Sequence, residues 1–236
     1  MYTWDSRVRF SEVGEDKRLT LDGVLNYFQD CSTIQSEDLG NGMEAVEALH
    51  RVWVLNAWQI VVNEYPKLGE KIVTGTWPYE FNRFFGSRNF IMYGEDGRVL
   101  AYANSLWTYL NSENGRPARV DDEILNLYQL EPKYDMEYAD RKITLPGTME
   151  SRKSFPVEVY HLDTNHHVNN GQYVKMAGAY LPQDFHIAQM RAEYKKSALL
   201  GDMIYPRVHA EEDKVIVSLE DEAGTSFAIV EFRNTL

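Results

Sequence analysis

The side chains with the clearest chemical potential lie in the stretch HLDTNHHVNNGQYV, residues 161–174. Asp163, Asn165 and His167 alternate there, so their side chains would project to one side of the chain if its backbone is extended. Residues 169–171 (Asn-Asn-Gly) follow directly and form a good N-cap region for an amphipathic helix. The pattern therefore predicts a carboxylate, an amide and an imidazole beside the positive end of a helix dipole.

These groups suit the hydrolysis of a thioester. A histidine has an ordinary pKa of about 6.5, so His167 can take a proton from an attacking water at neutral pH. The backbone N–H groups of Asn170 and Gly171 can stabilise the oxyanion of the tetrahedral intermediate. Asn165 can orient the water or donate to the oxyanion. Asp163 can fix the histidine tautomer or act as nucleophile or base, and the sequence leaves both roles open.

Two simpler interpretations compete with this one. Asp-Thr-Asn before a helix is also a common Asx-turn and capping sequence, which needs no chemistry. A metal site is the second, because His161, Asp163, His166 and His167 lie close together. Adjacent histidines on an extended chain would point to opposite sides, however, and no second metal-binding pattern follows downstream. The residues therefore disfavour a metal site.

The elements that must position these residues occur twice in the chain. Residues 8–30 align with residues 157–179, and each segment predicts a short strand with alternating apolar positions, a polar loop and an amphipathic helix. The step LGEKI (68–72) resembles LGDMI (200–204). The matched apolar residues are Val8, Phe10, Val13, Leu19, Val24 and Leu25 in the first copy and Val157, Val159, Leu162, Val168, Tyr173 and Val174 in the second.

Each copy then continues as a run of strands. The apolar residues 52–65 predict a buried strand, and Gly94-Glu95-Asp96-Gly97 predicts a turn between two later strands. We expect an α+β protein in which each half wraps an antiparallel sheet around a central helix. The N-terminal half covers residues 1–130, with a short helix near its end. Residues 131–150 form a linker, and residues 151–236 form the C-terminal half. The remaining predicted strands span 72–79, 88–93 and 99–110 in the first half and 205–210, 215–219 and 226–232 in the second.

The first copy keeps the apolar positions and lacks the polar ones. Gly14, Asp16 and Arg18 stand where the second copy has Asp163, Asn165 and His167. A sequence that only capped a helix would have less reason to differ between the copies. We therefore predict that the second half is catalytic and that the first binds the substrate.

Composition excludes several other classes of protein. The net charge of −12 argues against a general nucleic-acid or anionic-membrane binder, which needs a basic surface. No apolar run reaches the ~18 residues of a membrane span, and residues 1–10 lack the apolar core of a secretory signal. Cys31 is the only cysteine, so an intrachain disulfide is impossible and the cytoplasm is the expected location.

The chain resembles the acyl-ACP thioesterases of plants and bacteria over nearly its whole length. The resemblance is carried by VRFSEVGEDKRLTL, by WQIVVNEYPKLGEKIVTGTW, and by LDTNHHVNNGQYV followed by RAEYKKS. It implies a double-hotdog fold, release of free fatty acid from acyl carrier protein (ACP), no cofactor, and a homodimer. The family's catalytic aspartate, asparagine and histidine match Asp163, Asn165 and His167.

One family feature is missing. Where the family has adjacent acidic and cysteine residues after a basic pair, this chain has Ser197 and Ala198. A cysteine nucleophile is therefore excluded at this place, and Ser197 is at best a weaker hydrogen-bonding substitute. The acid–base work is then expected to rest on the three residues of the motif.

The resemblance also places the acyl tunnel in the first half. It suggests as lining the helix of residues 21–34 and four tryptophans, namely Trp53, Trp58, Trp77 and Trp107. The expected partner is the acidic ACP with its phosphopantetheine-linked acyl chain, which would need a local basic surface. Arg191, Lys195 and Lys196 are the candidates for that surface. An acyl-CoA thioesterase, a non-catalytic acyl-binding protein and a dehydratase remain alternatives, because a hotdog fold does not fix function.

Overall fold

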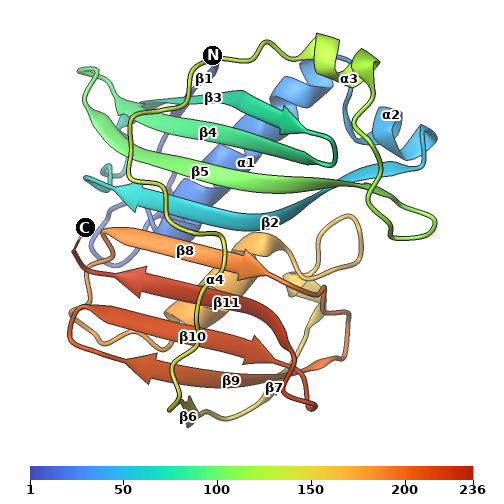
Figure 1. Ribbon diagram of the computed structural model, residues 1–236. Coiled ribbons are helices and arrows are strands. Elements are labelled where there is room, and N and C mark those ends of the chain that lie inside the picture. The colour runs from blue at the N-terminus through green and yellow to red at the C-terminus, as the bar shows by residue number, and fades with distance from the viewer. Residues whose placement is uncertain (236) are drawn as a thin grey trace. The chain divides into compact units, whose positions relative to one another are not determined.

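The computed structural model describes residues 1–235, and the chain divides into two compact units. Unit 1 comprises residues 1–56 and 60–138, and unit 2 comprises residues 57–59 and 139–236. Each unit contains an antiparallel sheet with one main helix on its inner face, as Figure 1 shows. Within the described residues, no helix has the length and apolar character to cross a membrane.

Unit 1 carries its strands in the order β1-β3-β4-β5-β2. The turn between β4 and β5 closes through a hydrogen bond from the Gly97 N–H to the Gly94 C=O (2.9 Å), with Gly97 at a φ of 80°. The elements of unit 1 are β1 (Tyr2–Arg7), a 3₁₀ turn (Phe10–Glu12), α1 (Leu21–Asp38), α2 (Met43–Ala48), β2 (Arg51–Val62), β3 (Lys71–Asn82), β4 (Phe85–Gly94), β5 (Val99–Asn111) and α3 (Asp122–Leu127).

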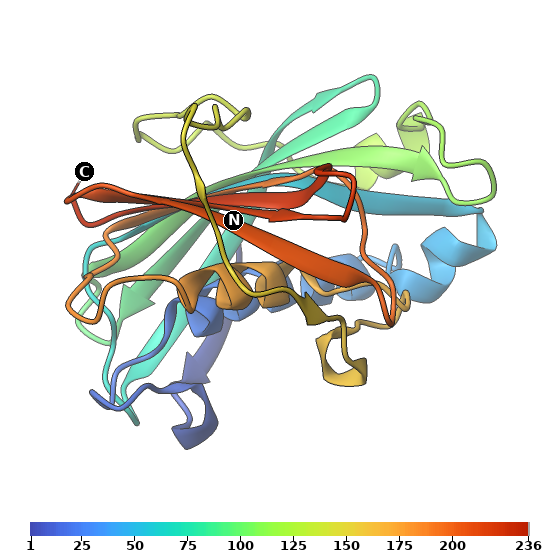
Figure 2. The same ribbon diagram turned by 90° about the horizontal axis from the view of Figure 1, so that it is seen from below.

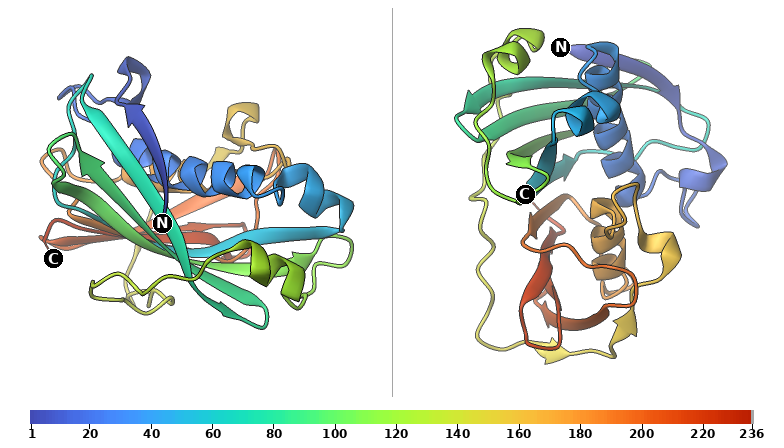
Figure 3. Two further views of the ribbon diagram at one scale, coloured as in Figure 1. Left: turned by 90° about the horizontal axis from the view of Figure 1, so that it is seen from above. Right: turned by 90° about the vertical axis from the view of Figure 1, so that its right-hand side faces the viewer.

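Helix α1 packs its apolar face on the sheet of unit 1 (Figure 3, left). The Thr20 hydroxyl caps the helix by accepting the Gly23 N–H (3.2 Å). Phe28 meets Phe90 of β4 with ring centroids 5.4 Å apart. Cys31 is fully buried on the same face, and burial raises the pKa of its thiol to about 12. It is a core residue, as its place in the predicted helix indicated.

A cation lies in this same layer. The guanidinium of Arg88, on β4, is buried and donates to Gln35 of α1 (2.5 Å) and to Thr76 of β3 (3.1 Å). It also lies 5.5 Å from the ring of Tyr128. No carboxylate pairs with it among residues 1–235, and burial lowers its pKa to about 10. The guanidinium is therefore held by neutral groups only, at a cost in desolvation.

Unit 2 carries its strands in the order β8-β11-β10-β9-β6, and β7 pairs with β9. Helix α4 lies on one face of this sheet and packs on β10 and β11 (Figure 2). The elements of unit 2 are β6 (Glu150–Ser151), β7 (Phe155–Pro156), a 3₁₀ turn (Val159–His161), α4 (Asn170–Gly178), β8 (Gln189–Tyr194), β9 (Met203–Ala210), β10 (Lys214–Glu220) and β11 (Ser226–Arg233).

Residues 131–149, which we call the strap, follow the sheet face opposite the helix in each unit (Figure 3, right). In unit 1 the Trp77 indole donates to the Pro132 carbonyl (2.9 Å). The side-chain oxygen of Asn89, on β4, accepts both the Tyr134 N–H (3.1 Å) and the Tyr138 hydroxyl (3.0 Å). This part of the strap is therefore held by specific polar bonds as well as by edge-on and tilted aromatic contacts.

In unit 2 the strap is anchored by Arg191 of β8. Its guanidinium donates to the carbonyls of Asp140 (2.5 Å) and Lys142 (3.2 Å) and pairs with Glu231 (3.1 Å). Ile143 of the strap packs into a buried cluster with residues of β10 and β11. The carboxylate of Glu193 accepts the Ile143 N–H (3.0 Å).

The predicted α+β architecture of two tandem halves is confirmed. Six of the predicted sheet strands lie within observed ones, whereas the strand predicted at 52–65 ends earlier, at Val62 of β2, and β1 and β8 were not predicted. The strands predicted at the start of each copy are wrong. Both segments form 3₁₀ turns, in which Phe10 is 83% exposed and Val159 is 69% exposed while Val8 and Val157 are buried. The apolar alternation there does not mark one face of a sheet.

Candidate active site

The loop of residues 163–168 is a tight turn. The Asp163 N–H donates to the His167 carbonyl (2.8 Å), and the His166 N–H donates back to the Asp163 carbonyl (3.1 Å). His166 has a φ of 59°, in the left-handed region that few non-glycine residues adopt. The extended backbone that would have aligned the three side chains is therefore absent. The structure instead gathers Asp163, Asn165 and His167 around one turn.

The Asp163 carboxylate shapes this turn. Its Oδ1 accepts the N–H of Asn165 (2.8 Å) and, at longer range, the N–H of His167 (3.4 Å). This is an Asx-type capping arrangement. Among residues 1–235 the second oxygen, Oδ2, makes no hydrogen bond, and neither do the Asn165 amide and the His167 ring. Asn165 is exposed and His167 is half-buried, so both side chains are available to a substrate.

Helix α4 begins immediately after this loop. The Asn169 side chain caps it by accepting the Gly171 N–H (2.8 Å), and the Asn169 carbonyl accepts the Gln172 N–H (2.9 Å). In the part of the chain that the structure describes, the Asn170 N–H has no acceptor. Of the two amides expected to face an oxyanion, Gly171 is therefore committed to the cap and Asn170 remains free.

The chain leaving β8 closes the other side of the loop. The Val168 N–H donates to the Ala198 carbonyl (3.0 Å), and the Ala198 N–H donates to the buried Tyr173 hydroxyl (2.8 Å). Ser197, which precedes Ala198, is exposed. The Tyr194 hydroxyl donates to the Asn170 carbonyl (3.0 Å) in the first turn of α4.

The candidate carrier-docking residues divide into two groups. Lys195 and Lys196 are exposed and adjoin Ser197; Lys196 pairs with Asp221 (2.9 Å). Arg191 instead holds the strap, and only 13% of its side chain is exposed. Its donors are engaged within the protein, so Arg191 does not belong to our proposed docking surface.

Three further residues bond to the backbone around the loop, namely His161, Tyr173 and Tyr194. The sequence suggested His161 only as a possible metal ligand, and it did not indicate a functional role for the two tyrosines. The His161 Nδ1 accepts the Glu158 N–H (2.9 Å), and the His161 carbonyl accepts the N–H of Asn169, the helix cap. Burial lowers the pKa of His161 and raises the pKa of Tyr173 to about 12. The available signal was a polar residue at a core position of the repeat.

The first copy builds the same loop with other side chains. The Gly14 N–H donates to the Arg18 carbonyl (2.9 Å), just as the Asp163 N–H donates to the His167 carbonyl. The match extends to the residues that follow the strands. After β2, the N–H groups of residues 63 and 64 both donate to the carbonyl of residue 100; after β8, those of residues 195 and 196 both donate to the carbonyl of residue 227. The left-handed residues are also equivalent, namely Lys17 (φ 62°) and His166 (φ 59°). The predicted internal duplication is confirmed at the level of individual backbone bonds.

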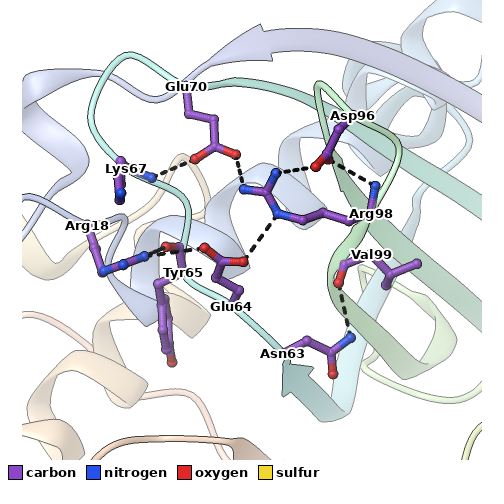
Figure 4. A network of polar contacts seen from close by, with 9 residues as sticks. All are labelled: Arg18, Asn63, Glu64, Tyr65, Lys67, Glu70, Asp96, Arg98 and Val99. Atoms are coloured by element: carbon purple, nitrogen blue, oxygen red, sulfur yellow. Dashed lines mark hydrogen bonds and ion pairs between the residues drawn. The ribbon is translucent and has the colours of Figure 1, made fainter.

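The side chains of the first loop form a charged network, which Figure 4 shows from close by. Arg18, the counterpart of His167, donates to the Tyr65 carbonyl (2.6 Å) and pairs with Glu64 (3.7 Å). Arg98 pairs with three carboxylates, those of Glu64 (3.2 Å), Glu70 (2.6 Å) and Asp96 (2.8 Å). Arg18 is committed to this network, so the position equivalent to His167 carries a paired cation and no base.

Two cavities, of about 500 and 430 Å³, lie in unit 2 away from the candidate loop. The larger lies under the strap beside Arg191, and the smaller lies beside β6 and β9. No residue of 161–174 lines either one. Within residues 1–235, no cluster of three or more His, Cys, Asp or Glu side chains has the arrangement of a metal site.

Two family models match the chain. The acyl-ACP thioesterase N-terminal domain matches residues 1–128, and the acyl-ACP thioesterase C-terminal domain matches residues 146–233. The palmitoyl-acyl carrier protein thioesterase of Cuphea hookeriana is 27% identical over 71% of this chain, and the oleoyl-acyl carrier protein thioesterase 1 of Arabidopsis thaliana is 24% identical over 84%. Both are chloroplastic, and the chain spans 43% and 60% of their lengths, about half of these curated relatives.

Solved structures show the same fold. An acyl-ACP thioesterase from Bacteroides thetaiotaomicron superposes with a TM-score of 0.89 at 22% identity, covering 98% of this chain and 96% of that one. The 12:0-ACP thioesterase from Umbellularia californica gives a TM-score of 0.86 at 18% identity, covering 99% and 97%. At these identities the likeness establishes the fold, and the double-hotdog expectation is confirmed.

Proposed function

The chain belongs to the acyl-ACP thioesterase family, and we propose that it hydrolyses fatty acyl-ACP to free fatty acid and ACP. The observation that carries the proposal is the combination of both family domains with an Asp-Asn-His turn at the start of α4, present in unit 2 only. An acyl-CoA thioester contains the same reacting group, so acyl-CoA is the alternative substrate.

In the proposed reaction, water attacks the thioester carbonyl carbon while His167 takes its proton as general base. The free N–H of Asn170, at the positive end of the α4 dipole, stabilises the oxyanion. The carbon–sulfur bond then breaks, and the His167 imidazolium returns its proton to the leaving sulfur, which departs as the thiol of ACP. Asn165 orients the water. Asp163, whose Oδ1 already holds the turn, has Oδ2 left to stabilise the imidazolium.

We assign acyl-chain binding to unit 1, between α1 and the inner face of its sheet. This layer is lined by buried apolar side chains such as Val24, Phe28 and Met92. Each methylene buried there contributes ~0.8 kcal/mol. Trp77 is excluded from the lining because its indole binds the strap, on the other face of the sheet. The Arg88 guanidinium lies in the proposed layer and would place a polar boundary on the acyl chain.

The proposed partner surface consists of Lys195 and Lys196 with the exposed apolar residues Leu199 and Leu200 that follow them. Cationic side chains are needed there because the protein itself carries a net charge of −12 and ACP is also acidic. Reversing both lysine charges is expected to raise KM for acyl-ACP more than KM for a simple acyl thioester. Equal effects on the two substrates would remove this surface from the proposal.

We also propose that the protein is a homodimer and that it acts in the cytoplasm.

The function is tested by measuring thiol release from acyl-ACPs of several chain lengths and from the matching acyl-CoAs. The wild-type protein is expected to turn over acyl-ACP with the higher kcat/KM. His167→Ala is expected to lower kcat by about 10²–10⁴-fold. Arg18→Ala changes the equivalent position of unit 1 and serves as the control, with kcat unchanged.

Two outcomes would contradict the proposal. Absence of turnover on every acyl-ACP would remove the activity itself. A folded His167→Ala variant that loses less than tenfold in kcat would remove His167 as the base while leaving the activity in place.

A further inference from the structure

We infer that Tyr173 and Tyr194 are positioning residues, which fix the start of α4 against the chain leaving β8 and so set the geometry around the catalytic loop. This inference rests on the proposed function. Neither hydroxyl contacts the three loop side chains; both act through the backbone on either side of the loop.

The two hydroxyls bond in opposite directions. Tyr173 of α4 accepts the Ala198 N–H (2.8 Å), which ties the helix to the exit of β8. Tyr194 of β8 donates to the Asn170 carbonyl (3.0 Å), which ties the strand to the first turn of the helix. The rings also meet, with centroids 6.1 Å apart. Helix and strand are thus joined twice, within a few residues of the free Asn170 N–H.

The catalytic loop lies between the residues that these two hydrogen bonds hold together. The Ala198 carbonyl accepts the N–H of Val168, the last residue of the loop, so Tyr173 acts on the loop through Ala198. The proposed oxyanion donor is the N–H of Asn170. Tyr194 bonds to the carbonyl of that same residue, so it holds Asn170 in place. The position of the His167 backbone relative to the Asn170 N–H is therefore fixed from both ends.

Unit 1 shows that the fold does not need these tyrosines. The positions equivalent to Tyr173 and Tyr194 are Val24 and Val62, both buried. Ala198 corresponds to Pro66, whose carbonyl still accepts the N–H at the end of the first loop, from Leu19 (2.8 Å). Proline has no N–H, so that copy needs no acceptor at the Tyr173 position. The tyrosine pair occurs only where the loop carries the catalytic residues.

A variant of Tyr173 alone changes stability as well as geometry, so it needs a second substitution beside it. Removing the Tyr173 hydroxyl leaves the buried Ala198 N–H unpaired, which destabilises any folded protein whether or not the bond matters for catalysis. Proline at 198 removes that N–H, and the Pro66 backbone shows that the fold accepts proline there. The double variant Tyr173→Phe/Ala198→Pro therefore removes the tie without leaving an unpaired amide.

The experiment compares kcat, KM and melting temperature for the wild type, Tyr173→Phe, Tyr194→Phe and the double variant, on the best acyl-ACP substrate. We expect kcat to fall at least tenfold in each variant, with KM within threefold of the wild type. We expect the double variant to recover the melting temperature that Tyr173→Phe loses, and not to recover kcat. Tyr109→Phe is the control, because the Tyr109 hydroxyl is buried without a hydrogen-bond partner within residues 1–235.

Recovery of kcat to within twofold of the wild type in the double variant would overturn the inference for Tyr173, which would then only satisfy a buried amide. A Tyr194→Phe variant with unchanged kcat would overturn it for Tyr194. A wild-type protein without turnover would instead contradict the proposed function, so the two failures are distinguishable.

Discussion

Replacing Asp163 by asparagine and by alanine separates the shaping of the loop from its chemistry. The carboxylate accepts one N–H at 2.8 Å and a second at 3.4 Å, and the longer contact contributes little. A bond to a charged group contributes about 1.5–3 kcal/mol, and partial exposure of the loop places this one at the lower end. Asp163→Ala should therefore lower the free energy of unfolding by about 1–2 kcal/mol.

Asp163→Asn keeps an oxygen that accepts the same two N–H groups, so its loss of stability should stay below about 1 kcal/mol. Its loss of activity should be much larger, because an amide cannot stabilise an imidazolium or act as a base. We expect kcat to fall about 10²-fold or more in both variants. Urea denaturation with an unchanged m-value measures the first quantity, and thiol release from acyl-ACP measures the second.

Asp16→Asn provides the matched control. Asp16 lies in the loop of unit 1, where its carboxylate accepts the Arg18 N–H (3.0 Å) in the same kind of turn. It should show a similar small change in stability and no change in kcat. If Asp163→Asn kept kcat within tenfold of the wild type, the carboxylate would be a turn former only and its assigned role in catalysis would be refuted.

Three further predictions concern stability. Burial lowers the pKa of His161, so between that pKa and about 6.5 the unfolded chain binds more protons than the folded one. The melting temperature should therefore fall as the pH drops through this window, and His161→Gln, which keeps an acceptor, should flatten the profile. His166→Gly relieves a left-handed φ of 59° and should raise the free energy of unfolding by up to about 1 kcal/mol; a loss would contradict the strain. Arg88→Met should melt within a few degrees of the wild type because relief of desolvation offsets the lost bonds to Gln35 and Thr76, whereas Arg88→Ala, with an added cavity, should lose about 3 kcal/mol or more.

The repeated elements could be predicted because their signals are local. Strand periodicity, the glycine turns and the Asn169 cap each depend on neighbouring residues only. The duplication was visible because both copies bury equivalent positions of the loop and helix, such as Leu19 and Val168. Most sheet strands of both halves followed from the same reasoning, but β1 and β8 were not predicted.

The failures have a physical reason in common, which is that hydrogen bonds overrode the pattern. The spacing of Asp163, Asn165 and His167 suits an extended chain, but the Asp163 carboxylate favours a turn by bonding to the backbone. The asparagine that caps α4 also consumes the Gly171 N–H that we had expected to face the oxyanion. The local sequence around Arg191 is typical of a surface cation. Its guanidinium instead binds carbonyls of the strap, which lies more than 40 residues away in sequence.

Two loops with one backbone path and unrelated side chains have a practical consequence. The trajectory of residues 14–19 and 163–168 is set by main-chain bonds, by one left-handed residue and by one aspartate acceptor in each loop, Asp16 or Asp163. Side-chain identity is therefore largely free at the other exposed positions. Segments of this length should be exchangeable between the copies without remodelling either sheet. The N-terminal loop therefore offers protein engineers a second, pre-shaped place in which to install a reactive group, independent of the native one.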